Sequence, residues 1–372
     1  MVPRPVECLR YGGGRAGEPI TQSASGGAVK TLVTGASGFL GGALVRRLVR
    51  DGEYEVAILV RATSDLRDIE GVLDRVEVVT GDLTDAASLD RAVAGVDVVF
   101  HSAARVDERG TRDRFWAENV TATTQLLTAA RAGGARRFVF ISSPSALMDR
   151  YGGDQVDIDE SVPYPSHYLN YYCETKAAAE RRVLASNAPD FTTCALRPRA
   201  IWGAGDRSGP IVRLLSRAAA GSLPDLSFGR EVYASLCHVE NIAEACVKAA
   251  TAQSVGGKPY FIADAEQTNV WRFLGQVAEE LGYRPPRRKL NPRMVNLLVE
   301  VIETLRRIPY LAAHWTPPLS RYSVAVMTRT ATYDTSAATR DFGYRPVVDR
   351  DSGIAELKDW LRTGEVVPET TR

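Results

Sequence analysis

The sequence predicts an α/β fold of the Rossmann type, with a doubly wound parallel sheet and a smaller C-terminal substrate-binding lobe. Short apolar runs alternate with longer amphipathic runs from Val29 onward, and this alternation is typical of strands followed by helices on both faces of a sheet. A glycine-rich turn lies directly between the first apolar run and the first amphipathic one. The length of 372 residues is enough for more than one domain.

Strands are expected at 30–35, 54–61, 75–82, 96–103, 137–141 and 191–196, and helices at 39–52, at 85–95, around 113–132 and around 168–185. These elements give roughly six strand-helix units, the size of a dinucleotide-binding fold. We expect a flexible leader at 1–27, an NADP-binding Rossmann domain at 28–200, a lobe at 201–365 with elements that return to the core, and a tail at 366–372.

Composition excludes several classes of protein. Lys and Arg number 46 against 45 Asp and Glu, so the net charge of +1 does not favour a nucleic-acid partner. No apolar run reaches the ~18 residues of a membrane span, and the N-terminus lacks the apolar core of a secretory signal. We expect a cytoplasmic protein whose five cysteines (Cys8, Cys173, Cys194, Cys237 and Cys246) are reduced thiols, with no metal site.

The segment 290–319 has apolar residues at helical spacing. Its simplest interpretation is a helix packed on the core. A wall of an apolar substrate pocket, or a weak contact with a membrane surface, is the alternative.

The turn from Thr34 to Gly41 reads TGASGFLG. After a strand and before a helix, its glycines allow a tight turn, a close approach of the backbone to a pyrophosphate, and packing of helix on strand. The helix N-terminus adds N–H donors and the positive end of the helix dipole. We therefore expect a nicotinamide dinucleotide to contact Gly35, Ser37, Gly38, Phe39, Leu40 and Gly41.

The end of the second strand bears on the choice of cofactor. NAD-binding proteins place a carboxylate there, about 20 residues after the glycines, whereas this strand ends in Val60 and Arg61. A guanidinium suits a 2′-phosphate, so NADP(H) is favoured; the alternative is a solvated Arg61, with Asp65 leaving NAD open. After the third strand, Asp82 and Leu83 are expected at the adenine, or else Asp82 forms a local turn.

Three residues form a candidate catalytic set. Tyr172 and Lys176 are four residues apart on one predicted helix face, and a nearby ammonium lowers the pKa of a phenol toward the working range. Ser143 follows the fifth strand at the carboxyl edge of the sheet, where ligands bind in open α/β folds. Tyr172 would exchange a proton with a carbonyl oxygen, Ser143 would polarise that oxygen, and Lys176 would also hold the cofactor ribose.

Further residues have weaker assignments. Asn119 is expected either to anchor a proton-relay water or to cap nearby backbone. Ser145, Arg199 and Arg207 are candidate substrate contacts, and the alternative for the two arginines is a solvated surface.

The motifs TGASGFLG (34–41), GDL (81–83), HSAA (101–104), SS (142–143), YCETK (172–176), ALRPRAIWGAGD (195–206) and CHVENIAEA (237–245) occur in the order found in extended short-chain dehydrogenases/reductases, which this chain resembles over roughly 29–365. The resemblance implies a Ser143, Tyr172 and Lys176 triad, with Ala103, Ala104 and Pro198 beside the cofactor. It also makes a homodimer an expectation.

Within that family, the segments 142–149, 159–168 and 317–346 are most similar to the 3β-hydroxysteroid dehydrogenase-like branch, and more narrowly to bacterial 2-alkyl-3-ketoalkanoate reductases. The resemblance implies an NADPH-dependent ketoreductase that acts on a hydrophobic β-keto acid or related ketone. Arg199 departs from the His expected in those relatives. The alternatives are a 3β-hydroxysteroid-type dehydrogenase, a nucleotide-sugar epimerase or dehydratase, and a non-catalytic NADP-sensing protein.

Overall fold

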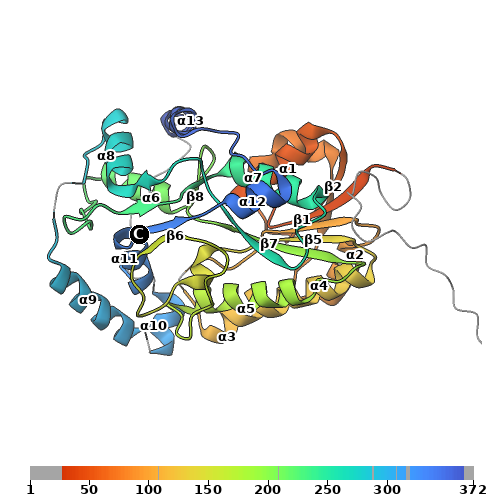
Figure 1. Cartoon of the computed structure of the whole chain (residues 1–372), viewed down its shortest axis with the longest axis horizontal. Coiled ribbons are helices and arrows are strands. Elements are labelled where there is room, and N and C mark those ends of the chain that lie inside the picture. Colours follow the sequence, from red (N-terminus) through yellow and green to blue (C-terminus); the bar gives the residue numbers. More distant parts are fainter. Residues whose placement is uncertain are drawn as a thin grey trace, which may run out of the picture.

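The computed structural model describes residues 27–107, 109–207, 209–286, 289–306, 308–315 and 319–363. Almost all of the expected leader, all of the expected tail and Cys8 lie outside these residues. A seven-stranded parallel sheet is the centre of the fold, with strand order β11-β7-β5-β4-β1-β2-β3 (Figure 1). Its strands are β1 (Val29–Thr34), β2 (Tyr54–Val60), β3 (Val76–Thr80), β4 (Val98–His101), β5 (Arg137–Ile141), β7 (Thr192–Pro198) and β11 (Lys258–Ile262).

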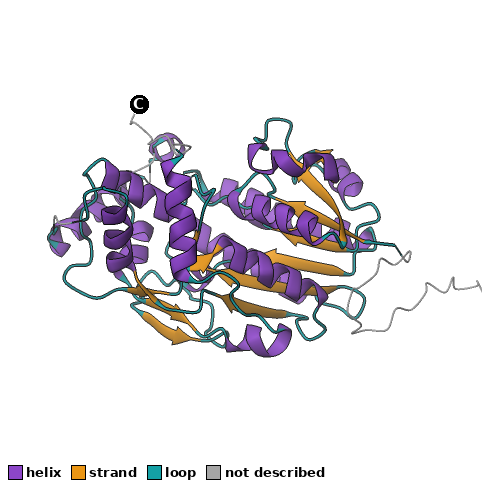
Figure 2. Cartoon of the chain, turned by 90° about the horizontal axis from the view of Figure 1, so that it is seen from above, coloured by secondary structure: helices purple, strands orange, loops and turns teal. Residues whose placement is uncertain are grey.

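Helices cover both faces of this sheet (Figures 1 and 2). One face carries α1 (Phe39–Asp51), α7 (Val239–Thr251) and α12 (Ser336–Phe342), and the other carries α2 (Ala86–Ala92), α4 (Ala122–Ala132) and α5 (Tyr171–Ala185). The expected doubly wound Rossmann-type fold is confirmed. The strand order reverses direction between β1 and β4, and ligands bind outside the carboxyl ends of the strands at such a point.

Strand β5 shows why the central strands are continuously apolar. Val139 and Ile141 point into the core under α1 and α7, whereas Phe138 and Phe140 point into the core under α2, α4 and α5. Alternate side chains of a strand face opposite sides, and helices cover both sides here, so the four residues after Arg137 are all apolar. The arrangement places the end of β5 in a buried environment.

A second lobe contains a four-stranded sheet of order β12-β9-β13-β6 and a two-stranded sheet of β8 with β10. Its strands are β6 (Gln155–Ile158), β8 (Ile201–Trp202), β9 (Tyr233–Ala234), β10 (Cys237–His238), β12 (Thr268–Asn269) and β13 (Ala331–Tyr333), and its helices are α6 (Pro210–Ala219), α8 (Val270–Glu280), α9 (Pro292–Leu305), α10 (Pro309–His314), α11 (Arg321–Thr328) and α13 (Arg350–Arg362). Strand β6 lies in this lobe although it precedes the expected boundary at 200. Strand β11 and helices α7 and α12, from later in the sequence, pack in or on the large sheet.

The predicted helix around 113–132 is interrupted. It comprises α3 (Arg112–Trp116), a π-helical turn η2 (Ala117–Thr121) and α4, while two 3-10 helices, η1 (Arg67–Arg75) and η3 (Pro144–Leu147), occupy loops. None of the described helices is long and apolar enough to cross a membrane. In the same described ranges, no group of three or more His, Cys, Asp or Glu side chains is arranged to hold a metal ion. The four described cysteines, Cys173, Cys194, Cys237 and Cys246, are free and buried.

Candidate active site

The glycine turn after β1 has the close packing expected from its sequence. Gly35 has φ +75°, and a Cβ atom there would lie 2.7 Å from the main-chain nitrogen of Ala103. A Cβ on Gly41 would lie 2.0 Å from the carbonyl oxygen of Gly35. Both positions therefore require glycine, since a side chain at either would push the turn away from β4 or from α1.

The start of α1 fits the phosphates of a dinucleotide. Gly38 is the N-cap residue, no side chain caps the helix, and its first turn has no acidic residue. The first N–H groups and the positive end of the helix dipole are thus available to an anion. Ser37 and Gly38 are exposed and Phe39 is half-buried, while Leu40 and Gly41 are buried, so Leu40 can reach a ligand only through its backbone.

The ends of β2 and β3 bring Arg61 and Asp82 together. The exposed Arg61 follows β2, and its charge contributes to lowering the pKa of Asp82. The largest cause of that lowering is the hydrogen bond that the Thr84 hydroxyl donates to Oδ1 of Asp82. The main-chain nitrogen of Thr84 donates to the same oxygen. Oδ1 of Asp82 therefore forms the local turn that was the alternative interpretation of this residue. Leu83, beside it, is half-buried.

A buried histidine that was not among the predicted site residues ties the glycine turn to α4. The ring nitrogens of His101 lie 2.7 Å from the Thr34 hydroxyl and 2.8 Å from the Thr123 hydroxyl. Burial, with a smaller contribution from Lys176, lowers the pKa of His101 to about 3, so the ring is neutral. The HSAA motif was the available signal, and after it Ala103 and Ala104 are half-buried at the end of β4.

The candidate catalytic residues converge at the end of β5. Ser143 is the N-cap residue of η3, two residues after the strand ends, and it forms a side-chain hydrogen bond with Tyr172 of α5. One helical turn after Tyr172, the ammonium group of Lys176 donates to the carbonyl oxygen of Ile141 at 2.6 Å. Two residues of α5 and one residue of the loop after β5 therefore meet at the carboxyl edge of the sheet, the edge that also carries the glycine turn after β1.

Burial sets the protonation of the pair. It lowers the pKa of Lys176 to about 7, which Glu180 opposes. It raises the pKa of Tyr172 to about 12, which the hydrogen bond with Ser143 opposes. The direction for Tyr172 differs from the lowering that its spacing from Lys176 suggested, because the cost of burying a phenolate dominates. A phenol in this environment is held in the protonated form.

Both polar atoms of the Asn119 side chain have protein partners. Its Oδ1 accepts from the main-chain nitrogen of Arg105 at 2.7 Å, and its Nδ2 donates to the Arg105 carbonyl and to the Thr175 hydroxyl, both at 3.1 Å. The backbone-capping alternative is the one that the structure shows. Asn119 fastens the π-helical turn to α5, one residue before Lys176.

Ser145 belongs to a pair that the sequence did not predict. Its hydroxyl lies 3.0 Å from the hydroxyl of Tyr322 on α11, and the Tyr322 ring meets the Tyr172 ring edge-on with centroids 6.1 Å apart. Ser145 and Tyr322 are 177 residues apart in sequence, and no local pattern marks Tyr322. The second lobe thus reaches Tyr172 through this side chain.

The two candidate substrate arginines have structural partners. Arg199 is buried and donates to the carbonyl oxygens of Ala331 and Val326 at 2.8 and 3.1 Å. Arg207 forms an ion pair with Asp68 at 2.9 Å. Arg199 thus links the end of β7 to the second lobe, and Arg207 links the loop after β8 to η1. These contacts do not support a contact of either arginine with a substrate carboxylate. Pro198 is the last residue of β7, at the same edge as Ile141.

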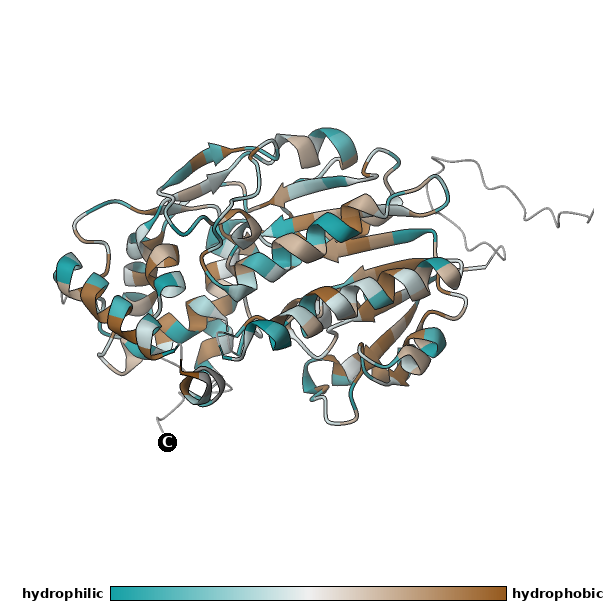
Figure 3. Ribbon diagram, turned by 90° about the horizontal axis from the view of Figure 1, so that it is seen from below, coloured by the Kyte–Doolittle hydropathy of each residue, from teal (hydrophilic) through white to brown (hydrophobic). Residues whose placement is uncertain are grey.

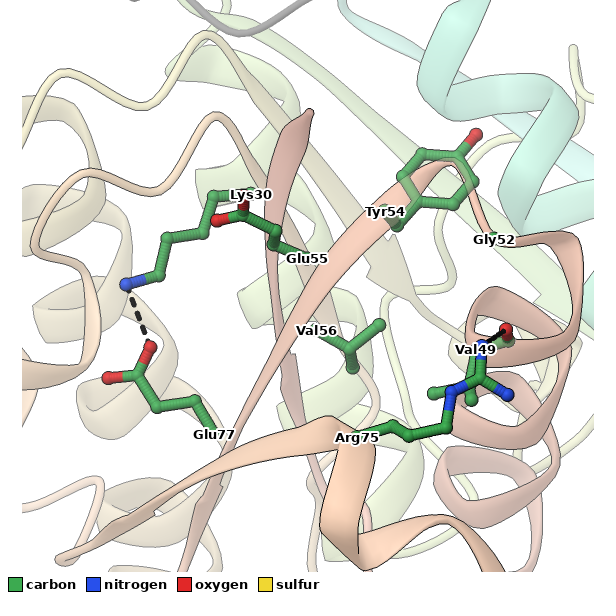
Figure 4. A pocket seen from close by; sticks show the side chains of 8 residues that line it. All are labelled: Lys30, Val49, Gly52, Tyr54, Glu55, Val56, Arg75 and Glu77. Atoms are coloured by element: carbon green, nitrogen blue, oxygen red, sulfur yellow. Dashed lines mark hydrogen bonds and ion pairs between the residues drawn. The ribbon is translucent and has the colours of Figure 1, made fainter. Parts of the chain in front are cut away.

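A hollow of about 330 Å³ lies at the opposite edge of the sheet (Figure 4). Lys30, Gly52, Tyr54, Arg75 and Glu77 are among its lining residues, and Lys30 pairs with Glu77 at 2.8 Å. These residues belong to the amino ends of β1, β2 and β3 and to their flanking loops. The hollow is therefore separate from the candidate active site.

Comparison with known proteins identifies the family of this chain. The sequence profile of the 3-beta hydroxysteroid dehydrogenase/isomerase family matches residues 32–292. The chain belongs to this family. A 2-alkyl-3-oxoalkanoate reductase of Stenotrophomonas maltophilia is 34% identical over 340 residues, which cover 89% of this chain and 98% of that protein.

Other relatives carry different substrate names. A 3 beta-hydroxysteroid dehydrogenase/Delta 5-->4-isomerase of Mycobacterium tuberculosis is 32% identical, with 88% of this chain and 89% of that protein covered. Among solved structures, gox2253 superposes with a TM-score of 0.72 at 28% identity, over 90% of this chain and 98% of that one. MoeE5 in complex with UDP-glucose and NAD gives a TM-score of 0.68 at 25% identity, over 90% and 99% of the two chains. The expected resemblance to this family is confirmed, and the chain is an oxidoreductase by family.

Proposed function

We propose that this member of the 3-beta hydroxysteroid dehydrogenase/isomerase family is an NADPH-dependent ketoreductase that reduces a hydrophobic β-keto acid or related ketone. The observation that carries the proposal is the convergence of Ser143, Tyr172 and Lys176 at the end of β5, at the same carboxyl edge of the sheet as the glycine turn. A binding protein that only senses the cofactor has no need of these three groups together.

The mechanism follows from the protonation of these groups. Tyr172, whose burial raises its pKa to about 12, is the proton donor to the carbonyl oxygen. Ser143 donates a hydrogen bond to the same oxygen and so stabilises the negative charge that develops on it. The bound nicotinamide supplies the hydride at the carbonyl carbon. Lys176, held by the Ile141 carbonyl, fixes the turn of α5 that carries Tyr172 and provides a positive charge near pH 7.

The preference for NADPH rests on Arg61. Its exposed guanidinium stands where the second strand ends, and the strand carries no carboxylate at that point. Arg is suited to a 2′-phosphate through planar, charge-assisted hydrogen bonds. MoeE5 was solved with NAD, so both cofactors need to be compared directly.

The substrate class rests on relatives and on the second lobe. Relatives from Stenotrophomonas maltophilia and Shewanella oneidensis are named 2-alkyl-3-oxoalkanoate reductase, at 34% and 32% identity. We assign substrate binding to the lobe that carries α11, because Tyr322 reaches the ring of Tyr172. A 3β-hydroxysteroid dehydrogenase is the second candidate, favoured by the relative from Mycobacterium tuberculosis at 32%.

The proposal extends to assembly and compartment. A groove of about 890 Å³ runs between α4 and α5 and is lined by Leu127, Arg131, Arg182 and Phe191 among others. We assign it to the homodimer contact, which sedimentation equilibrium would test. A reducing, cytoplasmic compartment suits the four free buried thiols.

A substrate panel tests the proposed activity. Purified protein would be mixed with NADPH or NADH and with 2-alkyl-3-oxoalkanoates of increasing chain length, a 3-ketosteroid or a UDP-sugar, while NAD(P)H absorbance is followed. We expect NADPH oxidation with the oxoalkanoates, at rates that rise with chain length. Turnover of the steroid alone would favour the second candidate, and no turnover of any ketone would contradict the proposal.

A further inference from the structure

Helix α9 has two separate apolar faces. Val295, Val299 and Ile302 are buried in the core of the second lobe. A second set follows the spacing i, i+3, i+4, i+7 and i+11 on another face, and two more apolar side chains continue it beyond the helix. This exposed α9 stripe consists of Met294, Leu297, Leu298, Val301, Leu305, Ile308 and Tyr310, whose exposed fractions range from 40% to 71%. The expectation of a helix packed on the core therefore holds for only one face.

The stripe makes up a large share of the exposed apolar side chains in the described part of the chain. Of the thirteen large hydrophobic residues that are exposed there, seven belong to it. Figure 3 views the molecule from the side on which α9 lies in Figure 1, and hydrophobic residues occur along the helices of that lobe. A contiguous exposed apolar surface of this kind marks an interaction site.

Exposed basic residues lie at the N-terminal end of the stripe. Lys289 precedes α9 and Arg293 lies in its first turn, and both are exposed, whereas Arg306 after the last turn is half-buried. The sequence from 281 to 299 contains no Asp or Glu. The two acidic residues of α9 are engaged elsewhere: Glu300 pairs with Arg321 of α11, and Glu303 accepts from the Arg321 main-chain nitrogen at 3.3 Å.

We propose that the exposed α9 stripe lies in the plane of an anionic lipid surface. A helix with an apolar stripe and basic flanks binds at the headgroup boundary, where the stripe leaves water and the cations meet anionic lipid. A second copy of this chain fits less well, because parallel pairing of two α9 helices would set the exposed Arg293 of one copy against Arg293 of the other. The 14 residues of α9 rise ~21 Å, less than a membrane span needs.

The docked face is one helix away from the candidate active site. Arg321 holds α9, and the next residue, Tyr322, contacts both Ser145 and Tyr172. A hydrophobic substrate dissolved in the lipid would thus meet the protein near α11. This last step rests on the proposed function, whereas the docking itself does not.

Vesicle sedimentation of the full chain tests the proposal. Vesicles of phosphatidylcholine with 30% phosphatidylglycerol, of phosphatidylcholine alone, and the anionic vesicles in high salt are compared. We expect binding to the anionic vesicles that weakens in high salt. Leu297→Gln/Val301→Gln should weaken that binding at least tenfold, whereas Asn296→Gln, at an exposed polar position outside the stripe on the same helix, should leave it within about twofold. Lys289→Gln/Arg293→Gln should also weaken it about tenfold.

Other outcomes overturn the proposal. Wild-type protein that stays in the supernatant with every vesicle, or equal losses in Leu297→Gln/Val301→Gln and in Asn296→Gln, would remove lipid docking. If Leu297→Gln/Val301→Gln instead converts a dimer into a monomer and no form binds vesicles, the stripe is a contact between copies of the chain. NADPH binding by each variant checks that it is folded, and lack of ketone turnover by vesicle-bound protein would count against the proposed function alone.

Discussion

The ammonium group of Lys176 donates a hydrogen bond of 2.6 Å to the main-chain carbonyl of Ile141. The same group lies 4.2 Å from the centroid of the Phe140 ring. Both partners are the last residues of β5, two or three positions before Ser143. This contact therefore fixes α5 relative to β5, and with it the position of Tyr172 relative to Ser143. Burial lowers the pKa of Lys176 to about 7.

The lowered pKa of Lys176 predicts a dependence of stability on pH. Between pH 7 and 10.5 the unfolded chain binds a proton at Lys176 that the folded chain does not bind. The free energy of unfolding should therefore rise with pH across this window, by at most about 1.4 kcal/mol per pH unit, and the contribution is lost as pH falls toward 7. Urea denaturation of wild type and Lys176→Met at pH 7, 8 and 9 would measure the difference. Parallel pH profiles for the two proteins would show that Lys176 is charged throughout.

Two helical glycines should respond oppositely to alanine. A Cβ added to Gly41 of α1 would lie 2.0 Å from the carbonyl oxygen of Gly35, whereas one added to Gly275 of α8 would have no atom within 4 Å. Gly41→Ala should destabilise the protein by about 1–3 kcal/mol and weaken NADPH binding, because the turn must shift. Gly275→Ala should stabilise it by up to about 1 kcal/mol through helix propensity. Thermal denaturation of both variants measures these effects, and a Gly41→Ala protein as stable as Gly275→Ala would refute the packing of the turn.

The buried ion pair between Arg197 and Glu180 should hold α5 on β7. Arg197 donates to both Glu180 oxygens at 2.6 and 3.0 Å, and both side chains are almost fully buried. Arg197→Met should cost about 3–5 kcal/mol, because Glu180 keeps a buried charge with only the Tyr164 hydroxyl as a further donor.

Adding Glu180→Leu to Arg197→Met should recover part of this loss, because the unpaired charge is then gone. The exposed pair of Arg272 and Glu231 is the matched control, and Arg272→Met should cost less than about 1 kcal/mol. Chemical denaturation of wild type, the two single variants and the double variant completes a double-mutant cycle. A double variant no more stable than Arg197→Met would argue against the charge explanation.

Arg61 should determine the preference between cofactors. Arg61→Ala should weaken NADPH binding at least tenfold, or about 1.4 kcal/mol, and leave NADH binding nearly unchanged. Nicotinamide fluorescence titrations measure both affinities. Arg67→Ala is the control, because Arg67 is an exposed neighbour already paired with Asp65 at 2.7 Å. Equal affinities for the two cofactors, indifferent to Arg61, would move the assignment to NAD.

Local patterns account for the fold and for part of the site. The strands and helices of the large sheet from β1 to β7 could be predicted from the alternation of apolar and amphipathic runs. The residue pattern of each run depends on how much of that element is buried, and this is a local property. The glycine turn, Ser143, Tyr172 and Lys176 lie on these elements and could be placed with them. The interruption at η2 was not visible in the helical pattern of 113–132, since a π-helical turn keeps the same residue types.

Long-range contacts could not be foreseen. Strands β6 and β13 pair although about 175 residues separate Asp157 from Thr332, which are hydrogen-bonded. Tyr322 reaches Ser145 over a similar separation. The partners of Arg199 could not be foreseen either, and it was therefore a candidate for a substrate carboxylate. Its acceptors are the main-chain carbonyls of Val326 and Ala331, whose positions depend on the whole fold.

The central claim is that Tyr172 is the proton donor, and Tyr172→Phe tests it most directly. The variant keeps the ring and removes one oxygen, so we expect NADPH affinity to stay within about twofold. Its single-turnover rate of ketone reduction should fall by a factor of about 10²–10⁴. An unchanged rate of NADPH oxidation with the same ketone would contradict this account of the active site.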